Sequence, residues 1–336
     1  MATAIQPLNR LHVGIEATKG TIIPATRLIE CDAKLIEEIE FYRSNYPSGF
    51  RSNTGGAGTI TRKGTRYEIP MDASPEDILP FLLSGVRGGV TAIGAGADKT
   101  WTFEPQLTTG VPTLDTLTVE GLRTDGVTNH YYGESGYGLT ESISLEWTVN
   151  GPVTCTVVVV GRAAQTGAPT ASLVQYTGRE ILSSNQLGVY VDSTWAGLGT
   201  TQLLGTTKSV KYEFMSGFRG GYTLDQRTDR DFYDHEVGRA TAKLSTTMEL
   251  DATAAARLAE RRANSLTFWR LKSIGGAIGA TTKMIQIDGC YRWTGFDGNG
   301  VENDQNLVTA ELESVLDTTS SKSILWTVIN GLTSAN

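Results

Sequence analysis

Apolar and polar residues alternate over many short stretches of the chain, and this period of two predicts half-buried β-strands. The alternation is clear in Leu11–Thr18 near the start of the chain and again in Leu187–Thr194 just past its middle. Both segments end in an acidic residue, a small residue and a threonine. We therefore expect a strand of the same kind near the start of each half of the chain.

A strand followed directly by a helix is the second feature that occurs twice. Thr65–Met71 and Ala242–Leu250 are predicted strands, and a helical pattern follows each of them at nearly the same spacing as the first pair of segments. Ser74 and Thr253 are the expected N-cap residues, because a hydroxyl can accept the hydrogen bond of a free backbone N–H. Pro80 falls inside the first helix, which is therefore expected to be short.

A pair of strands closes each half. The strands Ser142–Val149 and Thr154–Val160 flank the Asn-Gly pair that begins at Asn150, which is typical of a hairpin turn. In the second half the corresponding strands are Val308–Leu316 and Ser323–Ile329. The last strand of each half is an apolar segment followed by glycine, Gly161 in the first half and Gly331 in the second.

Three correspondences in the same order indicate a duplicated domain. The predicted fold is mainly β: two tandem, related β-sandwich or barrel domains, each with one flanking α-helix. Residues 10–163 and 185–333 form these domains. Residues 1–9 are an N-terminal arm, and 164–184, rich in Thr, Gly, Pro and Ser, form a linker.

Each half also contains one long polar loop, Tyr42–Thr61 in the first and Ser216–Gly238 in the second. Loops of this length are uncommon unless they have a function, and exposed aromatic side chains mark contact surfaces. We expect these aromatics to be exposed on the single chain. The candidate contact residues are Tyr46, Phe50, Arg51, Phe218, Arg219, Tyr222, Phe232 and Tyr233.

Composition adds two constraints. The net charge is −7 and no run of basic residues is longer than two, so the chain lacks the basic face with which proteins grip nucleic acid. Three widely spaced cysteines predict neither a disulfide framework nor a zinc site. Residues 1–7 do not resemble a signal peptide, and no stretch of about 18 apolar residues predicts a membrane span.

Several residue clusters could be metal, phosphate or catalytic sites, but a purely structural role is favoured for each. The acids and histidine of 231–236 stand among arginines, which favours salt bridges over a metal. Segment 297–304 has Val301 where a calcium loop needs an oxygen ligand, and 94–100 has Asp98 where a phosphate loop needs glycine. The three histidines and Ser216 form no nucleophile motif. We predict no catalytic, cofactor or metal residues, and no enzyme.

The arrangement resembles the major tail tube protein of long, non-contractile-tailed bacteriophages, in its duplicated two-domain type. The resemblance covers nearly the whole chain and lies in patterns of strand, glycine and helix. It rests on Leu11–Thr26, Gly58–Arg62, Phe81–Gly85, Trp101–Pro105, Phe296–Gly300 and Thr327–Asn330.

This resemblance implies a structural virion protein whose sheets join into rings and whose rings stack into a tube, through which DNA passes without specific binding. Three two-domain chains would form a pseudo-sixfold ring, and the two long loops would bridge successive rings. The implied partners are the tail tip or initiator, tape measure and tail terminator proteins, and the implied location is the virion tail, assembled in the host cytoplasm. The acid cluster of Glu37, Glu38 and Glu40 is a candidate for the tube lumen.

One alternative stays open: a two-domain β-sandwich binding module, such as a glycan-binding or adhesin-like surface protein. A hydrolase with Glu37 and Glu40 as paired carboxylates has no catalytic motif behind it, and hydrolase activity lost on mutating either residue would revive it.

Overall fold

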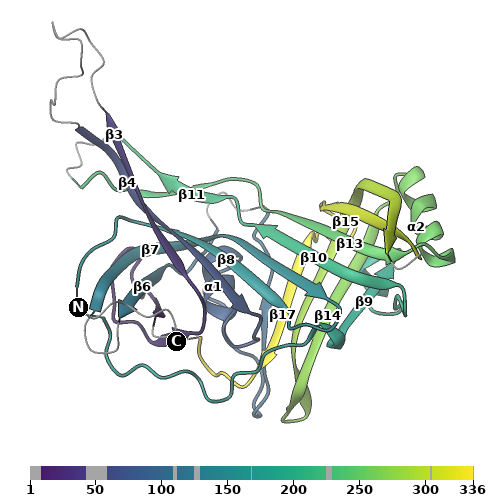
Figure 1. Cartoon of the computed structure of the whole chain (residues 1–336), viewed down its shortest axis with the longest axis horizontal. Coiled ribbons are helices and arrows are strands. Elements are labelled where there is room, and N and C mark those ends of the chain that lie inside the picture. Colours follow the sequence, from purple (N-terminus) through teal and green to yellow (C-terminus); the bar gives the residue numbers. More distant parts are fainter. Residues whose placement is uncertain are drawn as a thin grey trace, which may run out of the picture.

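The computed structural model describes residues 9–335 except 43–58, 109–111, 125–128, 168, 225–228 and 303–304 (Figure 1). Its architecture is mainly β, as predicted. The strands of the first half are β1 (Arg10–Ile15), β2 (Arg27–Ile29), β3 (Lys34–Tyr42), β4 (Thr59–Asp72), β5 (Lys99–Phe103), β6 (Leu117–Thr124), β7 (Asn129–Thr148) and β8 (Thr154–Gly161). Those of the second half are β9 (Leu187–Asp192), β10 (Thr207–Met215), β11 (Phe218–Gly221), β12 (Asp234–Val237), β13 (Thr241–Glu249), β14 (Thr267–Ile278), β15 (Thr281–Glu302), β16 (Gln305–Ser314) and β17 (Ile324–Asn330).

The same strand order occurs in both halves. Antiparallel pairing gives β1-β6-β7-β8-β4-β3 in the first half and β9-β14-β15-β16-β13-β10 in the second. A helix follows the matching strand each time: α1 (Leu79–Gly85) after β4 and α2 (Ala252–Arg262) after β13. This repeated order is what the predicted duplication requires, although the division into two domains stays a prediction.

The two halves share one antiparallel sheet, which has 15 strands in the described part of the chain. β7 pairs with β10, and β5 of the first half pairs with β17 of the second. The main hydrophobic core also crosses between them: one cluster of buried residues contains Ile143 and Trp147 of β7 together with Phe214 of β10, and the Trp147 indole N–H donates to the Ser273 hydroxyl of β14 at 2.8 Å. The halves therefore bury apolar surface against each other as well as within themselves.

Both helix starts differ in detail from the prediction. Helix α1 begins at Leu79, and the Ser74 hydroxyl instead accepts hydrogen bonds from the backbone of Glu76 and Asp77 in the turn before it. Helix α2 begins at Ala252, so its N-cap is Asp251 and not Thr253. An aspartate at this position is at least as good an acceptor as a threonine.

The strands that close the second half also differ from the prediction. β16 and β17 do not pair with each other, because both lie along the same side of the long β15. In sheet order β8 therefore corresponds to β16, and the predicted match between the last strands of the two halves is wrong. In the first half β7 and β8 do pair, across a turn where Asn150 has a positive φ of 65°.

No helix in the described ranges is long and apolar enough to cross a membrane.

Candidate assembly interface

The junction between the halves is a complete strand pairing. Ser142–Thr148 of β7 lies opposite Ser209–Met215 of β10. On the inner face Phe214 lies opposite Ile143, and both are fully buried. On the outer face Lys211 lies opposite Glu146, which is a favourable cross-strand charge pair. The junction thus has an apolar face toward the core and a polar face toward solvent.

One end of the sheet is the edge strand β3. It pairs only with β4 among the described strands, and Figure 1 shows the two at one end of the long axis. Its exposed side chains include Ile36, Ile39, Phe41 and Tyr42. An edge strand presents unpaired N–H and C=O groups, so a long and apolar edge favours pairing with another chain.

Another open edge lies along the C-terminal part of β15, at the other end of the molecule. Residues 281–291 pair with β14, but on that side no described strand continues beside residues 292–302. Trp293 and Phe296 on this stretch are only partly buried, and their rings lie 6.3 Å apart. The equivalent strand of the first half, β7, has β10 beside it. Its inner-face residue Ile143 is fully buried for that reason.

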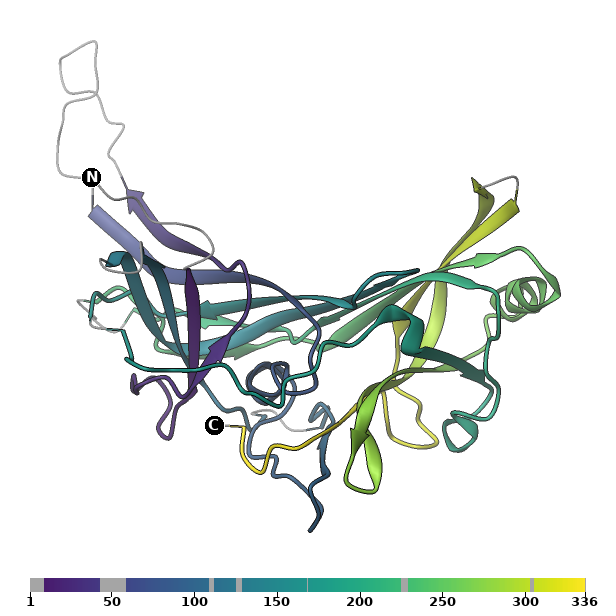
Figure 2. The ribbon, with the colours of Figure 1, turned by 60° about the horizontal axis from the view of Figure 1, so that its bottom comes forward.

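A two-stranded arm extends beyond the shared sheet. It consists of Glu38–Tyr42 and Thr59–Gly64, which pair with each other, while β8 pairs with β4 only from Thr65 onward. Figure 2 shows this arm rising at one end and the ends of β15 and β16 rising at the other. The arm's side chains Phe41 and Tyr42 are 58% and 56% exposed.

The candidate lumen acids are split between two faces. Glu38 and Glu40 share one face of β3 with Arg62 of β4, at carboxylate–guanidinium distances of 3.6 and 3.3 Å. Glu37 points to the opposite face, on the side of Leu35, because successive strand residues alternate. These ion pairs are exposed and each contributes at most about 1 kcal/mol. Whether any of the three faces a lumen stays a prediction.

The second long loop does not expose all its aromatics, which corrects the prediction. Part of it forms the β11–β12 hairpin, which folds onto the first half of the chain. Phe218 and Phe232 are only 6% and 2% exposed, and the Phe232 ring packs edge-on against Tyr137 of β7 at 5.2 Å. The Arg162 guanidinium lies 4.7 Å from the centre of the Tyr137 ring. These two phenylalanines therefore pack within the chain.

Polar contacts fix the hairpin in place. The Tyr137 hydroxyl donates to Asp234, which also accepts the backbone N–H of His235 at 2.8 Å. Burial and the neighbouring Asp234 carboxylate raise the pKa of Tyr137. Partial burial acts to raise the pKa of Asp234, but the hydrogen bonds from Tyr137 and His235 outweigh it and the pKa is lowered.

The remaining candidates of this loop are at the surface. Arg219 donates to Glu236 at 2.7 Å, and Tyr233 is 58% exposed. Tyr222 donates to the backbone carbonyl of Lys63 at 3.0 Å, beneath the Arg62 guanidinium, so it supports the base of the arm. Their contact role stays a prediction, and Tyr46, Phe50 and Arg51 lie outside the described residues.

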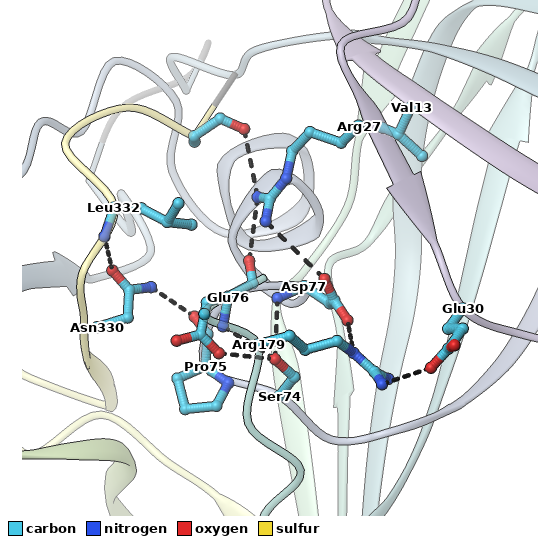
Figure 3. A network of polar contacts seen from close by, with 12 residues as sticks. Val13, Arg27, Glu30, Ser74, Pro75, Glu76, Asp77, Arg179, Asn330 and Leu332 are labelled. Carbon is cyan, nitrogen blue, oxygen red and sulfur yellow. Dashed lines mark hydrogen bonds and ion pairs between the residues drawn. The ribbon is translucent and has the colours of Figure 1, made fainter. Parts of the chain in front are cut away.

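A buried polar network that sequence reasoning missed ties the halves together (Figure 3). In the turn before α1, Asp77 accepts from Arg179 of the connector, which also donates to Glu30 at 2.7 Å. Arg27 of β2 donates to the backbone carbonyl of Glu76 at 3.0 Å. Burial raises the pKa of Asp77, although Arg179 beside it acts in the opposite direction.

The second half contributes to the same network. Lys283 of β15 lies 2.8 Å from the fully buried carboxylate of Glu76, and the Asn330 side chain of β17 donates to the Pro75 carbonyl at 2.7 Å. Buried charges are stable only when paired in this way. The network therefore fixes the turn before α1, the connector and two strands of the second half in one arrangement.

Two of the residues considered for catalysis, His12 and Ser216, make polar contacts within the fold. Buried His12 lies 3.0 Å from Glu120, and the Ser216 hydroxyl donates to the Glu141 carbonyl at 3.1 Å. Within the described ranges no group of three His, Cys, Asp or Glu side chains could hold a metal ion. Residues 297–302 of the calcium-like segment belong to β15, and 303–304 lie outside the described residues.

No protein-family model matches the chain, and no curated protein matches it.

Proposed function

We propose that the chain is a structural subunit that joins edge to edge with copies of itself into rings, and that the rings stack into a tube. The observation that carries this proposal is the β7–β10 junction. It joins two halves of equal strand order, and the strands equivalent to its two sides, β15 and β3, have open edges at opposite ends of the sheet.

A ring follows from these edges. Strand pairing between copies would cover the unpaired backbone groups of β3 and of the C-terminal part of β15, and ring closure would leave neither of these two edges exposed. Three copies would contain three internal junctions and three equivalent junctions between chains, which is a pseudo-sixfold arrangement. The resemblance in the sequence assigns such a ring to the tail tube of a long, non-contractile-tailed bacteriophage, as a conduit for DNA.

Stacking is supported by the two unlike rims of the sheet. The arm projects from one rim. The opposite rim carries exposed apolar side chains next to the strand ends, namely Val149, Leu204, Leu250 and Val301. A contact between unlike surfaces of identical subunits does not close on itself and generates a filament.

Electron microscopy of the purified chain tests the proposal. We expect negative-stain images over a range of concentrations to contain hollow tubes or rings with threefold symmetry. Sixfold rings with one chain per position would keep the tube and contradict the trimer. Monomers at every concentration would contradict self-assembly by this chain and favour the glycan-binding alternative.

A further inference from the structure

The pairing of β7 with β10 inside the chain predicts which residues would lie opposite each other where two copies pair. β7 contains an extra residue at Glu141 where it pairs with β8, and β15 contains one at Thr294 where it pairs with β16, followed by a second bulge between Asp297 and Gly300. The bulges at Glu141 and Thr294 are the first in each pairing and occupy the same place in the strand order of their halves, so the strands can be aligned on them. In this alignment Ser144 of the internal junction corresponds to Asp297 of the open edge, because each lies three positions beyond its bulge.

The partner strand is aligned by counting across the sheet. The same alignment matches Val159 of β8 with Leu312 of β16. From Val159 the pairing leads through β4 to Leu35 of β3, and from Leu312 it leads through β13 to Tyr212 of β10. Leu35 therefore corresponds to Tyr212, and the next residues, Ile36 and Glu213, correspond to each other.

The faces of the aligned strands agree. Leu35 packs against the core as Tyr212 does, while Ile36 and Glu213 point to the outer face. A shift by one residue would reverse this agreement for every side chain.

We propose that β3 of one copy pairs antiparallel with the C-terminal part of β15 of a second copy, with Ile36 opposite Asp297 and Glu38 opposite Gly295. This inference rests on the proposed self-assembly and reproduces the internal pairs of Glu213 with Ser144 and Met215 with Ser142. The pairing also brings Ile39, 38% exposed in the single chain, beside the partly buried Trp293.

Disulfide cross-linking tests the register. We expect the double variant I36C/D297C, assembled and then oxidised, to give covalent dimers and trimers on non-reducing gels, because directly opposite residues meet the distance that a disulfide needs. The variant S144C/E213C is the matched control and should cross-link within one chain only. The single variants I36C and D297C control for the partly buried Cys31 and should give no covalent oligomers.

A charge exchange tests the same pair without cysteines. Ile36→Asp places two carboxylates opposite each other, and we expect it to raise the concentration needed for assembly about fivefold. The double variant I36D/D297K replaces that repulsion by attraction and should restore assembly.

The outcomes separate the register from the function. Tubes in which I36C/D297C stays monomeric, while S144C/E213C cross-links, would overturn the register and leave the proposed function standing. Weakened assembly of I36D without recovery in I36D/D297K would also overturn it. A wild-type chain that never assembles would contradict the proposed function and the junction with it.

Discussion

At the residue scale, burial decides where sequence reasoning fails. The polar character of the second long loop predicts that its aromatics are exposed. Phe218 and Phe232 are buried because Tyr137 and Arg162, which belong to the first half of the chain, provide their packing surface. A contact over that separation leaves no local pattern, so only Tyr222 and Tyr233 of this loop's aromatics are placed as predicted.

The contact between Tyr137 and Asp234 predicts a pH-dependent stability. The pKa of Asp234 is lowered in the folded chain, so its carboxylate stabilises the fold above the pKa of an unfolded aspartate, about 3.9. That contribution is lost as the pH falls through the lower folded-state pKa. We expect Asp234→Asn to lower the urea midpoint at pH 6, with a smaller difference from wild type at pH 2.5.

Glu236→Gln is the matched control for this experiment. Glu236 lies on the same hairpin, but its ion pair with Arg219 is exposed and contributes little to stability. An equal loss of stability for Asp234→Asn at both pH values would show that the effect does not come from ionisation of Asp234.

At the scale of elements, the sequence predicts the positions of strands well but predicts poorly which strands pair with each other. Alternation places β1, β8 and β9 correctly to within a few residues, because side-chain direction along a strand is a local property. The pairing of β5 with β17 joins strands from opposite halves of the chain, and no periodicity carries that information. For the same reason the sequence pattern suggests that β16 and β17 form a closing pair, which they do not.

The helix cap of α2 gives a prediction at this scale. The Asp251 carboxylate accepts the Ala254 N–H at 2.9 Å, so Asp251→Ala should lower the free energy of unfolding by about 1 kcal/mol. Thr253→Ala, the cap expected from sequence, should change it by less than about 0.5 kcal/mol. Urea denaturation of both variants measures the difference, and a larger loss for Thr253→Ala would contradict the assignment.

At the scale of the whole molecule, the network around Asp77 makes the two halves one unit. Among the described residues, Arg179→Ala leaves the buried Asp77 carboxylate with only the more distant Arg27 as a cationic partner, at 3.8 Å. Breaking a buried ion pair in this way costs about 3 kcal/mol. We therefore expect a large fall in the urea midpoint, in a single transition for both halves.

Arg219→Ala is the comparison variant, because its ion pair is exposed and should contribute less than about 1 kcal/mol. Two separate unfolding transitions in Arg179→Ala, with one matching wild type, would contradict the coupling of the halves.

The composition of residues 164–184, dominated by Thr, Gly, Pro and Ser, predicts a plain linker. The ion pairs of Arg179 depend on partners from distant segments, so they become visible only in the folded chain.

The arm at one rim has a consequence for any filament of this chain. Each added ring would present its arms in the same direction, so the two ends of the filament would never be alike. Such a filament has a polarity. Its ends would grow at different rates, and a factor that recognises the arm would start or stop growth at one end only. A mechanism that sets the length of the filament would then need to act at one end only.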